Sequence, residues 1–64
     1  MTIWIPTRIV SPKTENRVYT IKGLRNGREY RNEAWYIHGK WRTVSGEWLK
    51  DVTEINFAIE SEDL

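Results

Sequence analysis

The chain has 64 residues, which is enough for one small domain and excludes a multidomain enzyme. It contains no Cys and a single His, so neither disulfides nor a structural zinc site can reinforce a core of this size. Hydrophobic residues make up 39% of the chain and aromatic residues 12%, which is typical of a folded domain and excludes a disordered one. We therefore expect a single domain over residues 1–64, stabilised by aromatic packing or by self-association.

Charge is divided along the chain. Residues 1–50 carry all ten Lys and Arg against four carboxylates, a balance of +6, whereas residues 51–64 carry five acids and no base. One account of the acidic end is that it improves solubility and partly neutralises the basic body. The other account is functional: the acidic end shields a basic face, or a partner recognises it. We favour the first account and expect residues 60–64 to form a flexible tail.

The sequence carries no signal for the membrane. No stretch approaches the ~20 apolar residues of a membrane span, and residues 1–10 lack the basic and then apolar pattern of a signal peptide. The absence of Cys fits a reducing compartment. We expect a cytoplasmic protein that does not contact a membrane.

Three turn signals divide the chain into segments of β character. Asn26-Gly27 suits a type I′ hairpin turn, in which both central residues take positive φ, and His38-Gly39 and Ser45-Gly46 supply two further breaks. The segments between them are rich in Val, Ile, Thr, Tyr and Trp, as strands are. The expected strands are residues 3–10, 17–23, 28–37, 40–44 and 52–59, with a polar loop over 11–16. The predicted fold is all-β, a single small antiparallel sheet or barrel of four to five strands.

Two parts of this assignment leave alternatives open. Pro6 cannot donate a hydrogen bond to a neighbouring strand, so it confines the first strand to a sheet edge or marks a bulge. Trp48, Val52, Ile55 and Ile59 are spaced by 4, 3 and 4 residues, which would align them along one side of a helix. We favour a strand over residues 52–59 because its apolar residues are mostly β-branched or aromatic and alternate with polar ones.

The alternation also assigns faces. Tyr19 lies on the opposite face of its strand to Lys22, and in residues 28–37 Trp35 lies on the opposite face to Tyr30 and Tyr36. Aromatic residues therefore occupy both faces of that strand. Such a sheet is covered on both sides, either by closing into a barrel or by pairing with another molecule. On this basis we expect a homodimer.

Side chains for catalysis are nearly absent. His38 is placed in a tight turn, where its ring points to solvent, and this argues against a Ser-His-Asp arrangement. Glu29 and Glu33 are four residues apart on one strand, roughly 13 Å, which is too far for the two carboxylates to share a water. Residues 23–27 are not followed by a helix and so do not form a phosphate-binding loop. We predict that the protein is not an enzyme and has no cofactor and no metal site.

Basic and aromatic residues alternate within one stretch of the chain. The candidate binding residues are Arg28, Tyr30, Arg31, Trp35, Trp41 and Arg42. Because Trp, Tyr and Arg are enriched at interface hot spots, we predict a protein-binding module. The alternative is a domain that binds single-stranded nucleic acid or nucleotides, although an isoelectric point of about 8.1 is low for that class. A purely structural explanation is that the aromatic residues form the core and the Arg and Lys stems cover it.

Three short motifs suggest an origin. Trp4-Ile5 near the start, Gly39-Lys40-Trp41 in the centre and Val52-Thr53-Glu54 before the final strand resemble a family of small uncharacterised phage and prophage proteins. That family has a Gly-x-Trp hairpin and ends in Val-Thr-His-Trp followed by prolines, whereas Glu54-Ile55 stands here in place of His-Trp. The resemblance implies an accessory protein of a phage or mobile element, and hence a modulator or inhibitor of a host protein.

Overall fold

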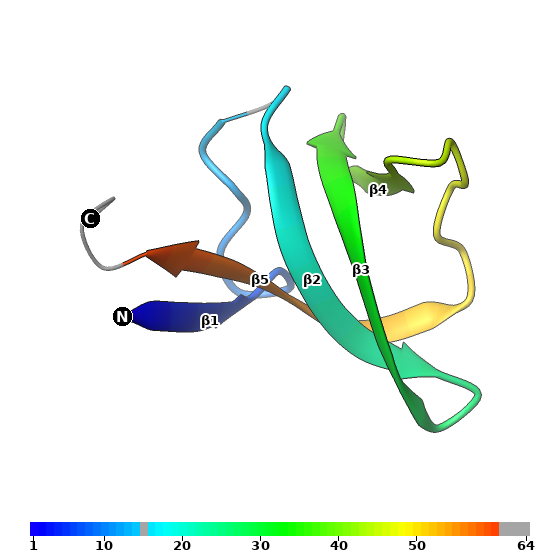
Figure 1. Ribbon diagram of the computed structural model, residues 1–64. Helices are drawn as coiled ribbons and strands as arrows, with labels where there is room; N and C mark the ends of the chain where they lie inside the picture. Colours follow the sequence, from blue (N-terminus) through cyan, green and yellow to red (C-terminus); the bar gives the residue numbers. More distant parts are fainter. Residues whose placement is uncertain (15, 61–64) are drawn as a thin grey trace.

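The protein folds into one open antiparallel sheet, which the computed structural model describes for residues 1–14 and 16–60 (Figure 1). The strands are β1 (Thr2–Pro6), β2 (Val18–Arg25), β3 (Arg28–Ile37), β4 (Lys40–Thr43) and β5 (Val52–Glu60). Their order in the sheet is β1-β5-β2-β3-β4. The described residues include no helix, and so none that could cross a membrane. The predicted all-β fold class is confirmed.

The first strand is shorter than the sequence predicted. It ends at Pro6 instead of Val10, because the proline carbonyl accepts hydrogen bonds from the N–H groups of Ile9 at 3.1 Å and Val10 at 3.2 Å. These bonds turn the chain away from the sheet. At the other end, residues 52–60 form a strand, so the helical alternative is wrong. Glu60, expected in the tail, is the last residue of β5, and residues 61–64 lie outside the described part.

The two predicted hairpin turns set the register of the central strands. Asn26 and Gly27 have φ of 54° and 75°, and His38 and Gly39 have φ of 48° and 81°, as type I′ turns require. The first turn aligns β2 with β3, from Arg25 opposite Arg28 to Val18 opposite Trp35. The second aligns β3 with β4 in the same way. This register decides which side chains share a face.

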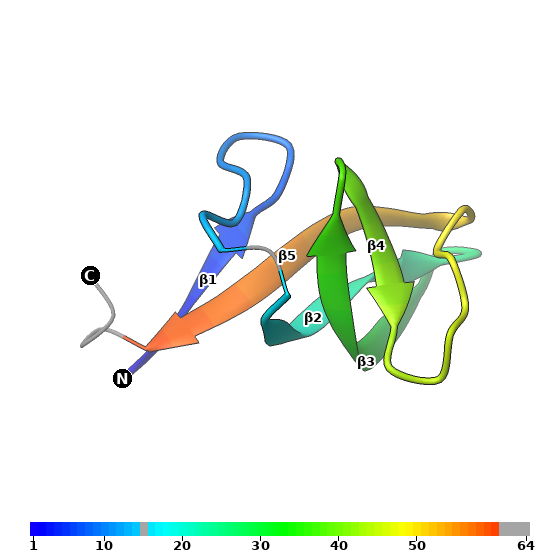
Figure 2. The same cartoon turned by 90° about the horizontal axis from the view of Figure 1, so that it is seen from above.

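The core lies on one face of the sheet, inside its curl. Figures 1 and 2 show that the sheet is strongly twisted, so that β1 and β5 run in a different direction from β3 and β4. The buried residues of the central cluster come from four strands and are Tyr19, Ile21, Ala34, Trp41 and Phe57. The Tyr19 ring meets the rings of Phe57 and Trp41 edge-on, with centroid distances of 5.4 and 6.1 Å.

The two edge strands of the sheet, β4 and β1, are protected from further strand pairing in different ways. Along β4, the N–H of Thr43 donates to the carbonyl of Glu47 at 2.8 Å and the N–H of Leu49 donates to the carbonyl of Trp41 at 3.0 Å. The segment 47–49 therefore covers this edge. The edge strand β1 has five residues and ends in Pro6, which has no N–H to offer a neighbouring chain.

Candidate functional site

The predicted binding residues do not all lie on one surface. Strand register places Arg31, Trp35 and Arg42 on the face opposite the core, here called the outer face. Tyr30 and Trp41 point to the core side. Arg28 is exposed next to the Asn26-Gly27 turn, away from the centre of the sheet.

Trp41 is a core residue, contrary to the assignment of its ring to a binding surface. Its side chain is only 4% exposed, and its ring lies 5.0 Å from the Tyr36 ring and 6.1 Å from that of Phe57. Tyr30 is half-buried: the Arg25 guanidinium lies 4.5 Å from its ring, and its hydroxyl accepts a hydrogen bond from Asn32. Neither aromatic ring contributes to the outer face.

A continuous row of side chains crosses the outer face. Val18 pairs with Trp35, Trp35 pairs with Arg42, and a β-bridge joins Arg42 to Trp48. Val18 and Trp48, at its two ends, are each 40% exposed. The four residues are here called the outer row. It presents two indole rings and an aliphatic side chain on paired backbone, which holds them in fixed relative positions.

Arg42 is held in place within the outer row. Its guanidinium lies 5.3 Å from the centroid of the Trp48 ring, and its Nε donates a hydrogen bond to the carbonyl of Gly46 at 3.3 Å. The first contact is a cation–π interaction, which both orients the Trp48 ring and keeps the charge partly shielded from water. The connection after β4 thus supplies a residue of the surface as well as covering the sheet edge.

A second group of side chains lies on the same face toward β1. Lys22 Nζ lies 4.3 Å from the centroid of the Trp4 ring, and the Arg31 guanidinium lies 6.0 Å from it. Lys22 and Arg31 are directly opposite each other on β2 and β3, an arrangement that is repulsive on its own. The aromatic ring and the Glu29 carboxylate, 2.8 Å from Arg31 Nε, reduce that repulsion.

Sequence reasoning missed Val18, Lys22, Trp4 and Trp48 as members of this face. Alternation within residues 17–23 does put Val18 and Lys22 on one side, but no local pattern indicates that β5 inserts between β1 and β2 and brings Trp4 across. Trp48 lies outside the regular strands, and only its bridge to Arg42 places it. A search for every Trp in the chain would have found Trp4 and Trp48, but not that they lie on the same face as Val18 and Lys22.

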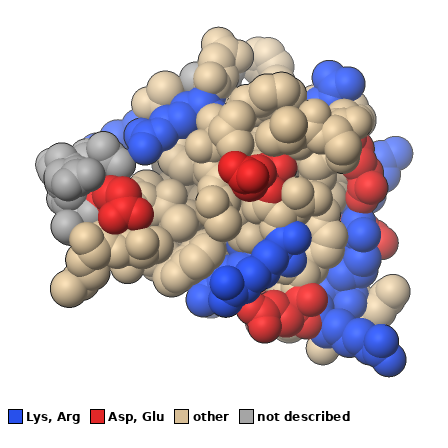
Figure 3. Space-filling model, viewed as in Figure 1, with Lys and Arg blue, Asp and Glu red and all other residues tan. Residues whose placement is uncertain are grey.

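The charges on the surface are mixed in sign. Figure 3 shows Lys and Arg next to Asp and Glu across the visible face, with broad uncharged areas between them. On the outer face, strand register places four cations, Lys22, Arg31, Lys40 and Arg42, together with the carboxylates Glu29 and Glu33. This pattern does not produce the one-signed potential that a nucleic-acid groove uses to attract phosphates.

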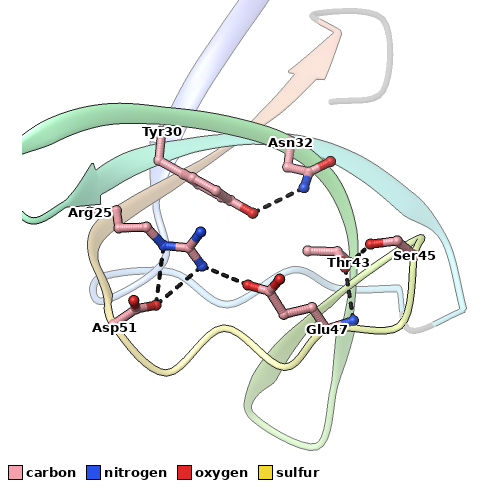
Figure 4. A network of polar contacts seen from close by, with 7 residues as sticks. All are labelled: Arg25, Tyr30, Asn32, Thr43, Ser45, Glu47 and Asp51. Atoms are coloured by element: carbon pink, nitrogen blue, oxygen red, sulfur yellow. Dashed lines mark hydrogen bonds and ion pairs between the residues drawn. The ribbon is translucent and has the colours of Figure 1, made fainter.

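The polar network on the core side supports the structure and does not form a site (Figure 4). Arg25 forms ion pairs with Glu47 at 2.6 Å and with Asp51 at 3.2 Å, which join the end of β2 to the connection 44–51. The hydrogen bond from Arg25 to the Glu47 carboxylate raises the pKa of the guanidinium above its usual value. Thr43 Oγ1, buried beside it, accepts a hydrogen bond from the N–H of Glu47 at 3.0 Å.

The described residues give little support for a metal site or for catalysis by histidine. No three His, Asp or Glu side chains there are grouped closely enough to hold a metal ion, and His38 is exposed in its turn. A comparison with protein-family models, curated proteins and solved structures finds no match to this chain. The resemblance to phage and prophage proteins therefore stays a prediction.

Proposed function

We propose that the protein is a non-enzymatic binding module that docks onto another protein through the outer face of its sheet, with the outer row at the centre. The observation that carries this proposal is the row itself. Two Trp and an Arg, the residue types most enriched at interface hot spots, are aligned with Val18 across adjacent strands. Side chains on paired strands lose little additional freedom on binding, which favours affinity.

The mixed charge around the row favours a protein partner over nucleic acid. A protein surface can match interspersed positive and negative groups, whereas phosphates would be repelled by Glu29 and Glu33. A cation also lies over one face of Trp4 and over one face of Trp48, and it would compete with a stacking base. Binding of single-stranded nucleic acid remains the alternative function, and the experiment below separates the two.

The finer proposal concerns the partner. A phage-encoded modulator or inhibitor would bind a host protein in the cytoplasm. This part depends on the resemblance of the motifs at Trp4, Trp41 and Val52 to small phage proteins, and on no feature of the outer face. It fits a module that has a binding surface and few groups for catalysis.

The test is affinity capture from host-cell lysate, with half of each sample treated with nuclease. We expect the wild-type chain to recover one stoichiometric protein in both halves. Trp35→Ala should lose it, because the substitution removes the centre of the outer row. Ile9→Ala is the matched control, since Ile9 is a 69% exposed hydrophobic residue outside that row. Circular dichroism checks that both variants are folded.

Three outcomes would count against the proposal. Capture that disappears on nuclease treatment would replace it with nucleic-acid binding. Equal recovery by Trp35→Ala and Ile9→Ala would move the interface away from the outer row. A lysate that yields no stoichiometric protein with any variant would reject a binding function toward the host.

A further inference from the structure

A hollow of about 500 Å³ lies apart from the outer row, between the end of β1, the first half of β5 and the Trp41 side chain. Its volume is within the range of sites that bind small molecules. None of the residues that line it belongs to the outer row, although Asn56 is the strand partner of Lys22, which lies over Trp4. It is therefore a second surface, separate from the outer row.

Two buried polar atoms belong to residues that line this hollow. Thr7 Oγ1 and Trp41 Nε1 are both shielded from solvent and have no hydrogen-bond partner within the described part of the chain. Buried polar groups are nearly always paired, so two unpaired ones at one hollow need an explanation. An indole N–H can only donate, which means that its missing partner must be an acceptor atom.

The backbone at the wall of the hollow is irregular. Between Lys22 and Leu24 of β2 there is one residue, Gly23, whereas the matching part of β5 has two, Glu54 and Ile55. Glu54 takes φ of 53° at this bulge, a conformation that is costly for a residue with a side chain. Bulges re-aim side chains and are frequent next to ligand sites. Here the bulge places Glu54 in the lining of the hollow.

Opposite charges lie at the rim. Arg8 and Glu54 both line the hollow and both are exposed, and neither side chain forms an ion pair or hydrogen bond with another described residue. Val52 and Ile55 also belong to the lining and add apolar side chains to it. The residues of the hollow thus combine a free cation, a free anion, a buried unpaired donor and an apolar surface.

We propose that this hollow binds a small zwitterion of the α-amino-acid class with an apolar side chain. The ligand carboxylate pairs with Arg8 and, once the atoms that shield Trp41 Nε1 from solvent move aside, accepts its hydrogen bond. Its ammonium group pairs with Glu54, and its side chain packs on Val52 and Ile55. A ligand with only one of the two charges would leave either Arg8 or Glu54 unmatched.

The test is a titration of ¹⁵N-labelled protein with L-leucine, followed by the indole N–H signals of the four Trp residues. We expect the Trp41 signal to shift saturably while those of Trp4, Trp35 and Trp48 stay in place. L-Leucinamide, which lacks the carboxylate, should leave the Trp41 signal unmoved. 4-Methylpentanoate, which lacks the ammonium group, should bind at least severalfold more weakly than L-leucine.

Variants of the two charged residues provide the second arm. Arg8→Gln and Glu54→Gln should each weaken L-leucine binding severalfold, and Lys50→Gln, an exposed charge outside the hollow, should not. Absence of a saturable shift up to roughly 20 mM, where a site of about 1 mM affinity would be nearly full, overturns the proposal. Equal binding of 4-methylpentanoate and L-leucine overturns the zwitterion assignment. Neither result depends on capture of a protein partner.

Discussion

The carbonyl oxygen of Thr53 lies 2.7 Å from the position that a Cβ on Gly23 would occupy. The Val52 Cγ1 atom is 2.9 Å from the same point, so the backbone of β5 presses directly on β2 at the bulge. Real Cβ atoms do not come so close to a backbone carbonyl. Only glycine allows this contact, which lies at the register shift between β2 and β5.

Gly23→Ala should therefore destabilise the fold. Because the nearest atom belongs to the backbone, the strand itself must move, and we expect a loss of about 1–3 kcal/mol in the free energy of unfolding. Urea denaturation followed by Trp fluorescence measures it. Gly27→Ala is a contrasting variant, since nothing lies within 4 Å of its Cβ position and only its φ of 75° is unfavourable. An unchanged midpoint for Gly23→Ala would contradict the close packing of β5 on β2.

Trp41 and Trp35 should differ sharply in their contribution to stability. Trp41→Ala removes a ring from the centre of the core and is expected to cost about 3–5 kcal/mol, enough to unfold a domain of this size. Trp35→Ala removes a half-buried ring from the outer face and should leave a folded protein with a smaller loss. Thermal unfolding by circular dichroism distinguishes them. Equal losses would mean that the two faces of the sheet are buried to the same extent.

The sequence predicted the turns well because their cause is local. Asn26-Gly27 and His38-Gly39 have positive φ, as two-residue hairpin turns of this type require, and this determines the pairing of β2, β3 and β4. The end of β1 was predicted four residues too late. A proline carbonyl that closes a turn onto Ile9 and Val10 has no signature in residue type.

The candidate site was harder to predict, because it depends on which face each aromatic ring occupies. Trp35 and Trp41 are both Trp in β-rich segments flanked by basic residues, yet register sends the first outward and the second into the core. The contact of Lys22 with Trp4 joins strands that are far apart in the chain. Only the insertion of β5 between β1 and β2 brings them together, and that order is a property of the whole fold.

Arg25→Gln should loosen the connection 44–51 without unfolding the sheet. The variant removes both ion pairs that anchor this segment, to Glu47 and to Asp51. Amide hydrogen exchange should become faster in residues 44–51 and stay unchanged in β2 and β5, with a smaller difference at high salt because these groups are exposed. Lys50→Gln is the control.

The direction in which pH changes the stabilising effect of the Arg25 ion pairs follows from the pKa of the arginine. The folded-state pKa of Arg25 is raised, so its contribution to stability is fully present below the unfolded-state pKa and is lost only as pH rises through the folded value. Both values lie well above neutrality. Faster exchange of residues 44–51 between neutral and mildly alkaline pH, beyond the intrinsic change in exchange rate, would contradict the assignment.

Self-association, if the predicted homodimer forms, should use the outer face. Pairing through sheet edges is restricted, since residues 47–49 cover β4 and β1 ends in Pro6. The outer row presents exposed apolar side chains on the strands, and a second copy placed there would bury Trp35. Trp35→Glu should therefore yield a 7.7 kDa species in sedimentation equilibrium at tens of micromolar, while wild type and Ile9→Glu sediment as dimers.

The same experiment connects self-association with partner binding. A dimer that buries the outer row and a host protein that needs it compete for one surface, so raising the concentration of the wild-type chain should lower the fraction that is free to bind. Above the concentration at which the dimer forms, less of the chain would then be available to capture a host protein. A wild-type chain that sediments only at 7.7 kDa would exclude the dimer, and it would leave the outer row fully available to a partner.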